Sequence, residues 1–201
     1  MNEFRNTNVL RTSVACFTLL LSACGGSGGG SDSDLDPSVS FAELNADAET
    51  TIGMFVDANG DLLAGVEVTD PENFPSGNVT YSGFITGSVD NVDLTGALQI
   101  EADFDDETFV ATADNFIDET DVSYSGSLTG DDGTINTEGD ADVPQLVVTI
   151  DGSLAAEGET FDTSLALDGD FVSDGGAAAG LAEGSVGSDI FEDGLFAVAE
   201  D

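Results

Sequence analysis

The sequence has almost no positively charged side chains. Its 201 residues include two lysines or arginines and no histidine, against 41 aspartates and glutamates. Both cations, Arg5 and Arg11, lie close to the start of the chain. Binding to nucleic acid or to an anionic lipid surface needs clustered lysine or arginine side chains that neutralise phosphates. The part of the chain after Arg11 therefore has no side chain that could attract nucleic acid or an anionic lipid surface by its charge.

The same shortage removes most catalytic and metal chemistry. Ser-His-Asp and Cys-His catalysis lack their base, Schiff-base catalysis lacks its lysine, and zinc sites lack histidine ligands. Cysteine occurs only at Cys16 and Cys24, so no disulfide framework is expected. An enzyme would have to rely on paired carboxylates, and the sequence marks no such pair. We therefore expect no catalytic residue, no cofactor and no metal ion, and we do not expect an enzyme.

Residues 1–23 predict an export signal. Arg5 and Arg11 precede an apolar run from Val14 to Ala23, which is typical of a signal peptide and too short for the roughly 20 residues of a membrane-spanning helix. The sequence Leu21-Ser22-Ala23-Cys24 is similar to the bacterial lipobox, in which the signal is cut before a cysteine that then carries diacylglycerol. We predict lipidation of Cys24. An ordinary signal peptide with an incidental cysteine is the open alternative.

Residues 24–38 predict a tether. The stretch "GGSGGGSDSD" after Cys24 is flexible and polar and has no apolar side chain to bury. In the bacteria where lipoprotein sorting is best known, an aspartate directly after the lipidated cysteine retains the protein in the inner membrane. Gly25 stands at that position here. The resemblance implies localisation to the outer membrane through the lipid anchor. It does not decide between the cell-surface face and the periplasmic face of that membrane.

Removal of the signal would leave a chain with no cation and with every acidic residue except Glu3. Such a chain repels itself, and salt weakens the repulsion because the Debye length falls from about 8 Å at physiological ionic strength to about 3 Å at 1 M. We infer a saline habitat. A disordered acidic protein is the alternative, and the alternating placement of the phenylalanines argues against it.

Alternating apolar and polar residues predict strands from residue 78 onward. In "DLTGALQIEADF", residues 93–104, the apolar side chains share one face with Gly96, while Thr95, Gln99, Glu101 and Asp103 share the other. The same period recurs in "VSYSGSLTG", "LVVTIDGSL" and "SLALDGDF". Turn signals separate these strands at Asp105-Asp106, Asp132-Gly133, Glu157-Gly158 and Gly175-Gly176.

Closely spaced strands with short turns favour an all-β fold, a small antiparallel up-and-down barrel of about eight strands over residues 78–201. The polar strand faces predict a soluble barrel with a filled interior. The near-repeat of "YSGFITG" as "YSGSLTG" is interpreted as barrel curvature, since a propeller needs at least about four blades. Glycines interrupt the apolar series and permit sharp coiling at Gly83, Gly126, Gly152 and Gly169.

Residues 39–77 predict a short helix followed by a hairpin. Ser40 and Glu43 have the spacing of a capping box, and Asn59-Gly60 is typical of a hairpin turn. Asp57, Asn59 and Asp61 also resemble the start of a calcium loop, but the residues at its glycine and glutamate positions do not fit. We interpret this stretch as a plain turn. We interpret three acidic clusters as solvated turns: Asp105-Asp106-Glu107, Asp118-Glu119-Asp121 and Asp131-Asp132. Weak binding of a divalent cation at these clusters is the open alternative.

Four stretches together resemble a known family: "FPSGNVTYSGFITG", "ADFDDETFVATADNF", "GDFVSDGGAAAGLAEGS" and "GLFAVAE". They are similar to the β-barrel domain of transferrin-binding protein B and its relatives, over about residues 74–200. The resemblance implies an eight-stranded barrel on a surface lipoprotein, often exported by a dedicated outer-membrane translocon. Family members capture host iron carriers, haem proteins or complement regulators. This chain has one barrel instead of two lobes and no basic residues there, so no binding residue is carried over.

The favoured function is a non-catalytic binding or accessory module on an outer-membrane lipoprotein, exposed on the cell surface. It would recognise a protein or a small cofactor through loops at one barrel end. A structural envelope lipoprotein with a hydrated acidic surface is the alternative, and an enzyme based on carboxylates is a third.

Overall fold

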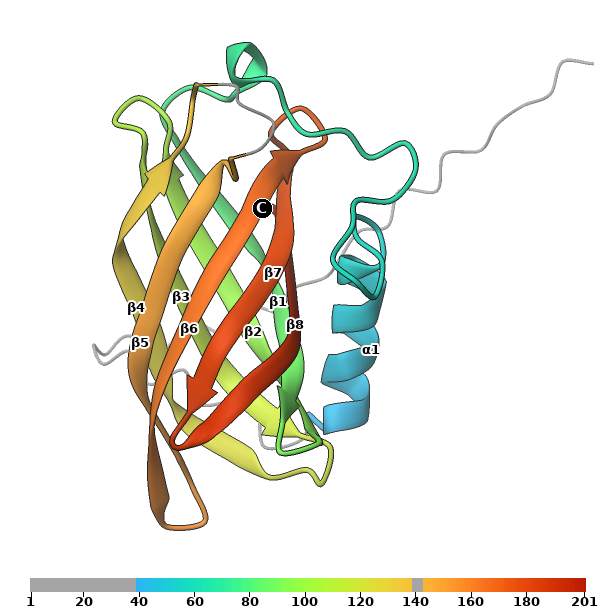
Figure 1. The fold of residues 1–201 in the computed structure, drawn as a ribbon, viewed down its shortest axis with the longest axis vertical. Coiled ribbons are helices and arrows are strands. Elements are labelled where there is room, and N and C mark those ends of the chain that lie inside the picture. Colours follow the sequence, from blue (N-terminus) through green and yellow to red (C-terminus); the bar gives the residue numbers. More distant parts are fainter. Residues whose placement is uncertain (1–38, 139–142) are drawn as a thin grey trace, which may run out of the picture. The chain divides into compact units, whose positions relative to one another are not determined.

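The computed structural model of the protein describes residues 39–138 and 143–201. The predicted signal peptide, Cys24 and the predicted tether lie outside the described residues. The described chain forms a closed barrel of eight antiparallel strands, with a helix along its outer wall (Figure 1). The elements are α1 (Phe41–Ile52), the 3-10 helix η1 (Pro71–Asn73), β1 (Asn78–Val89), β2 (Val92–Asp103), β3 (Thr108–Asp118), β4 (Ser123–Ile135), β5 (Leu146–Ala156), β6 (Glu159–Val172), β7 (Ala177–Val186) and β8 (Asp189–Glu200).

Each strand pairs with the next one along the chain, and β1 pairs with β8 to close the barrel. Tyr81 of β1 lies opposite Glu200 of β8. The predicted fold class is therefore confirmed. Three of the four predicted turns connect strands as expected, at Asp105-Asp106, Glu157-Gly158 and Gly175-Gly176.

The turn predicted at Asp132-Gly133 is wrong, because both residues lie inside β4. Gly133 lies opposite Phe109 of β3, and the pairing register shifts by one residue just beyond that pair. A Cβ atom at residue 133 would stand 2.7 Å from the Phe109 ring. The glycine makes room for an aromatic ring within a strand, and its aspartate-glycine sequence only imitates a turn.

The same arrangement of a glycine under a phenylalanine ring recurs on two other strand pairs. A Cβ atom at Gly96 would stand 2.6 Å from the Phe116 ring, and one at Gly87 would collide with the Phe191 ring. The register shifts at both glycines. Such bulges bend a strand, and a ring packed over a glycine fills the space that the missing side chain leaves.

The four glycines predicted to allow coiling lie against the backbone of a neighbouring strand. A Cβ atom at each would meet a carbonyl oxygen across the pair. The glycines and the residues that carry these oxygens are Gly83 with Ala197, Gly126 with Ser153, Gly152 with Ser127 and Gly169 with Ala179. This close approach supports the role in curvature that the sequence predicts.

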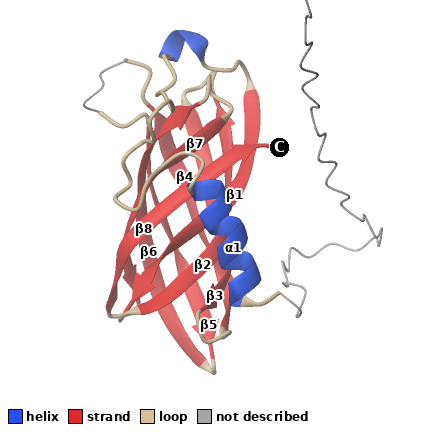
Figure 2. Ribbon diagram, turned by 90° about the vertical axis from the view of Figure 1, so that its right-hand side faces the viewer, coloured by secondary structure: helices blue, strands red, loops and turns tan. Residues whose placement is uncertain are grey.

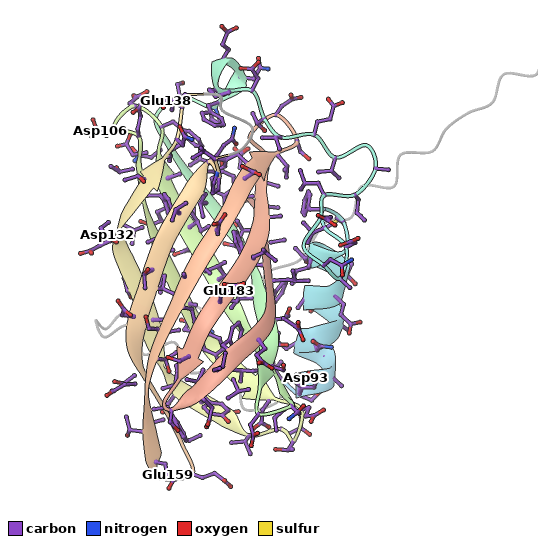
Figure 3. The ribbon with its side chains drawn as sticks, viewed as in Figure 1. Asp93, Asp106, Asp132, Glu138, Glu159 and Glu183 are labelled. Atoms are coloured by element: carbon purple, nitrogen blue, oxygen red, sulfur yellow. The ribbon has the colours of Figure 1, made fainter. Side chains whose placement is uncertain are left out.

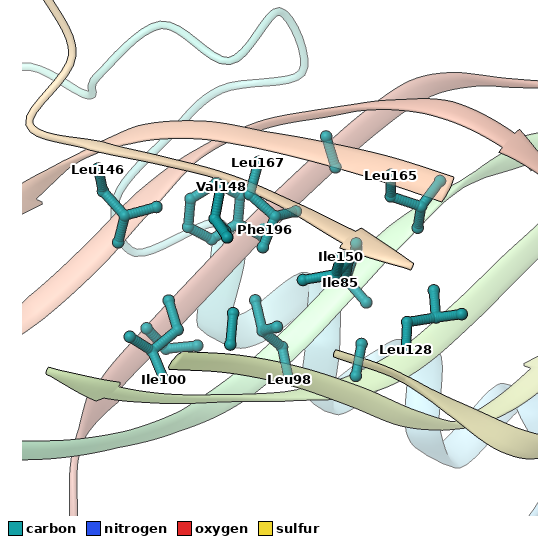
Figure 4. Packing of buried hydrophobic residues seen from close by; sticks show 14 of the residues in the cluster. Ile85, Leu98, Ile100, Leu128, Leu146, Val148, Ile150, Leu165, Leu167 and Phe196 are labelled. Carbon is teal, nitrogen blue, oxygen red and sulfur yellow. The ribbon is translucent and has the colours of Figure 1, made fainter. Parts of the chain in front are cut away.

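Apolar side chains fill the inside of the barrel. The strand faces predicted to be apolar are buried, as Leu98 and Ile100 of β2 and Val148 and Ile150 of β5 illustrate. Figure 4 shows these side chains pointing into the space between the strands. Burying each such side chain contributes about 1.5–3 kcal/mol, which offsets part of the repulsion among the acidic residues outside.

The segment around η1 and the residue before β5 close one end of the barrel. The backbone N–H of Thr69 donates to the carbonyl of Phe171 at 2.7 Å. Gln145 donates from Nε2 to the Thr69 carbonyl at 2.7 Å and accepts from the Phe171 N–H at 3.1 Å. The rings of Phe74 and Phe104 pack on Phe171 with centroids 5.4 and 5.1 Å away. This end is held by hydrogen bonds and aromatic packing together.

Helix α1 begins where its capping box predicts. The Ser40 hydroxyl accepts from the Glu43 N–H at 3.4 Å, and the Glu43 carboxylate accepts from the Ser40 N–H at 3.2 Å. One face of the helix is buried and lies along the barrel wall (Figure 2). The three buried side chains are Leu44, Ala48 and Ile52. Within residues 39–138 and 143–201, no helix has the length and hydrophobicity to cross a membrane.

Candidate functional site: a groove beside helix α1

A groove of about 550 Å³ lies on the outside of the barrel, between α1 and three strands. We call it the α1 groove. Its volume falls within the roughly 300–1,000 Å³ typical of ligand sites. The helix side and the turn after it contribute Asn45, Glu49, Ile52, Gly53, Val56, Asp57 and Ala58, and the strands contribute Thr86, Gly87, Ser88, Asp93, Leu94, Thr95, Asp193 and Leu195.

Strand pairing places the floor of the groove. Thr86 of β1 lies opposite Thr95 of β2 on one side and Leu195 of β8 on the other. Two residues further along β1, Ser88 lies opposite Asp93 of β2. The floor is thus a small patch of hydroxyl groups in the middle, with an apolar side chain and a carboxylate at its borders.

A bulge in β8 places a second groove carboxylate beside β1, opposite Gly87. The register between β1 and β8 shifts by one residue between Thr86 and Ser88, where Asp193 and Gly194 together oppose Gly87 and Glu192 opposes Ser88. Asp193 has a φ of 52°, in the left-handed region that aspartate tolerates better than most residues. Bulges redirect side chains. Carboxylates from β2 and β8 therefore stand on either side of β1.

Hydrogen bonds connect the floor to the helix wall. The Thr95 hydroxyl donates to Asn45 Oδ1 at 3.0 Å, and Asn45 Nδ2 donates to Glu49 Oε1 at 2.9 Å. Only 1% of Thr95 is exposed. The sequence places Thr95 on the wet face of its strand, but α1 covers that part of the face. The alternation of apolar and polar residues along β2 gives no indication of this long-range contact.

Four carboxylates converge on the groove from different parts of the chain: Glu49 of α1, Asp57 after it, Asp93 of β2 and Asp193 of β8. Figure 3 shows Asp93 next to α1. The Asn59 N–H that bonds to Asp57 lowers the pKa of that carboxyl group, against a smaller effect of burial. No lysine, arginine or histidine occurs in the described ranges, so no ion pair there neutralises these carboxylates.

The calcium-like stretch forms a turn. Asp57 Oδ1 accepts from the N–H groups of Asn59 at 2.8 Å and Asp61 at 3.2 Å. Val56 and Leu62 form an antiparallel bridge, which is the core of the predicted hairpin. Among the described residues, no three acidic side chains are grouped closely enough to hold a metal ion.

The other acidic clusters lie elsewhere. Asp105, Asp106 and Glu107 lie in the predicted turn. Asp118 is only 6% exposed, so the expectation of a solvated side chain is wrong for it. Asp131 and Asp132 lie on the exposed wall of β4 and not in a turn, because the register shift around Gly133 keeps the strand continuous.

A further group of carboxylates lies on the outer faces of β6 and β7, at Asp168, Asp170 and Glu183. Burial and the charges of Asp170 and Glu183 raise the pKa of Asp168. Burial also raises the pKa of Asp170, against a hydrogen bond from the Gln145 N–H. These side chains repel one another across neighbouring strands. The strand alternation predicts their outward direction, but not their proximity.

Comparison of the chain with protein families, with curated proteins and with solved structures finds no match.

Proposed function

We propose that this chain is a lipid-anchored lipoprotein of the outer membrane, exposed on the cell surface, which acts as a non-catalytic binding or accessory module. The α1 groove carries the binding role, because it is a concave surface with hydroxyl and carboxylate groups on the outside of a filled barrel. The sequence around Cys24 supports the anchor. The resemblance to transferrin-binding protein B supports surface exposure and export by a translocon, and membership of that family is part of the proposal.

The anchor is tested by mass spectrometry of the N-terminal peptide from membranes. We expect Cys24 to be the first residue and to carry diacylglycerol. The Cys24→Ala variant should leave the membrane fraction or stay unprocessed. A mature N-terminus without lipid would contradict the anchor, whatever the outcome for binding.

Surface exposure is tested by treating intact cells with proteinase K. Trypsin is unsuitable because the chain has no lysine or arginine beyond Arg11. We expect proteinase K to remove the protein from intact cells. Protection until the outer membrane is broken would instead place it in the periplasm.

Binding is tested by crosslinking on intact cells followed by capture of the protein. We expect a specific partner that is lost when the groove carboxylates are replaced. Repeated capture without any partner would favour the structural alternative, in which the acidic surface hydrates and spaces the envelope.

A further inference from the structure

We propose that the α1 groove binds a basic segment of a partner protein, with a lysine or arginine side chain placed over β1 between Asp93 and Asp193. This inference rests on the binding function proposed above and names the chemistry of the partner and its site.

The shape and chemistry of the groove fit a long cationic side chain. Ile52, Val56 and Leu195 supply apolar surface, and the carboxylates stand at the borders. Lysine and arginine combine an aliphatic stem with a charged end, so one side chain satisfies both kinds of surface. Other acidic residues, such as Asp131 and Asp132, are exposed on the strand wall and do not line the groove. The groove combines its carboxylates with a concave shape and an apolar lining.

The carboxylates of Asp93 and Asp193, one on each side of β1, have hydrogen-bonding capacity to spare. No hydrogen bond from the described residues reaches the side chain of Asp93 or Asp193. Neighbouring strands are about 4.8 Å apart, so the two residues are roughly 10 Å apart across β1. A cationic group above β1 at Gly87 and Ser88 therefore has Asp93 on one side and Asp193 on the other. Hydrogen bonds between charged groups are roughly twice as strong as neutral ones.

The helix wall provides a second anionic position. Asn45 holds one oxygen of Glu49 at 2.9 Å, which leaves the other oxygen of this carboxylate available. Asp57 lies further along the same side of the groove, in the turn that follows α1. A segment with more than one basic residue would reach both positions. Charge complementarity also favours a partner of this kind, because the described chain offers no cation of its own to compete for the groove.

The test measures binding of a probe to the full chain in mild detergent. The probe is a capped eight-residue peptide in which lysine alternates with alanine. Its partner probe carries glutamine in place of lysine. We expect the lysine peptide to bind and the glutamine peptide not to bind. Failure of the lysine peptide to bind the wild-type chain would overturn the inference.

Two double variants with equal loss of charge locate the site. Asp93→Asn with Asp193→Asn removes the groove carboxylates on either side of β1, and asparagine tolerates the positive φ of residue 193. Asp131→Asn with Asp132→Asn is the matched control on the exposed wall of β4. We expect about a tenfold or greater loss of affinity for the first variant and less than about twofold for the control. Equal losses would mean that the net charge attracts the peptide without a site.

Two further measurements complete the test. Glu49→Gln should weaken binding about threefold to tenfold, while the amide oxygen of the new side chain keeps the hydrogen bond from Asn45. Unchanged affinity of this variant would show that the helix wall is not part of the site. Spermidine serves as a small polyamine probe, and equal binding of spermidine would overturn the assignment of a peptide. If the groove variant captured a partner on cells as well as the wild-type chain does, the assignment of binding to the α1 groove would be overturned. The proposed binding function would stand.

Discussion

At the scale of single residues, Asp118 shows how the protein uses an acidic side chain as a structural acceptor. Its Oδ1 accepts from the Thr120 N–H at 2.9 Å, the Thr120 hydroxyl at 2.7 Å and the Val122 N–H at 3.1 Å. Its Oδ2 accepts from the Tyr124 hydroxyl at 3.2 Å. Burial raises the pKa of Asp118, but the combined hydrogen bonds outweigh burial and lower it. The carboxylate therefore organises the turn between β3 and β4 in its charged form.

We expect Asp118→Ala to lower the free energy of unfolding by about 1–3 kcal/mol, because it leaves several donors without an acceptor. Urea unfolding at neutral pH measures the change. The folded-state pKa lies below the ordinary value of 3.8, so the contribution of this carboxylate is complete above that value and is lost as the pH falls through the folded-state pKa. Glu119→Ala is the control, since Glu119 is exposed. Equal stability of both variants at neutral pH would contradict this role.

A second prediction at this scale concerns Gly96. A Cβ atom there would stand 2.6 Å from the Phe116 ring, and overpacking of this kind typically costs about 1–3 kcal/mol. We expect Gly96→Ala to destabilise the barrel by that amount in urea unfolding. Combining it with Phe116→Leu should cost less than the sum of the two single changes, because the shorter side chain removes the collision. Additive losses would show that the ring is not the obstacle.

At the scale of elements, α1 is attached to a wall made of small residues. Ile52 and Val56 pack against Ala179 of β7 and Ala197 of β8, whose short side chains let the helix and the following turn approach the sheet. Ala48 is fully buried. The helix thus depends on small residues on both sides of its contact with the barrel, and its position sets one wall of the α1 groove.

We expect Ala48→Phe to loosen α1 from the barrel at a cost of about 1–3 kcal/mol. Hydrogen exchange of the backbone amides reports this, since the amides of α1 should exchange much faster while those of β1 to β8 stay protected. Ala46→Phe places the same side chain on the exposed side of the helix. It should change neither the free energy of unfolding nor the exchange rates of the α1 amides. Unchanged protection of α1 in the Ala48 variant would mean that this contact is not tight.

Elements whose signals are local could be predicted from the sequence. The alternation around Leu98 and Ile100 places them inside the barrel, and Ser40 with Glu43 marks the start of α1. The burial of Thr95 could not be predicted, because it depends on a helix that begins more than forty positions earlier. The groove depends on the same contact and on the bulge at Asp193, whose residues resemble a turn in the sequence. The lipidation of Cys24 stays a prediction.

At the scale of the whole molecule, charge opposes folding. The full chain has a formal net charge of −39 at pH 7, and the described part contains no cation that forms an ion pair. Figure 3 shows acidic side chains spread over both ends and the wall of the barrel. Each carboxylate is therefore surrounded mainly by charges of its own sign.

We expect the melting temperature to rise by several degrees between low and 1 M sodium chloride, because screening shortens the Debye length to about 3 Å. Tetramethylammonium chloride at the same ionic strength is the control for general screening. Calcium chloride at matched ionic strength should stabilise the protein further only if an acidic cluster binds the ion. A melting temperature that is indifferent to salt would contradict the importance of repulsion.

The contact between Phe41 and Asp121 fixes the barrel end at which helix α1 begins. The Phe41 N–H donates to Asp121 Oδ1 at 2.8 Å, which fixes the start of α1 at the barrel end where β3 turns into β4. If the proposed lipidation of Cys24 holds, we expect that end to lie nearer the membrane than the end closed by Thr69 and Gln145. A fluorophore at Glu159→Cys, on the first of these ends (Figure 3), should be quenched by quencher-labelled lipids more strongly than one at Glu72→Cys in η1. Equal quenching would mean that the barrel tumbles freely on its anchor.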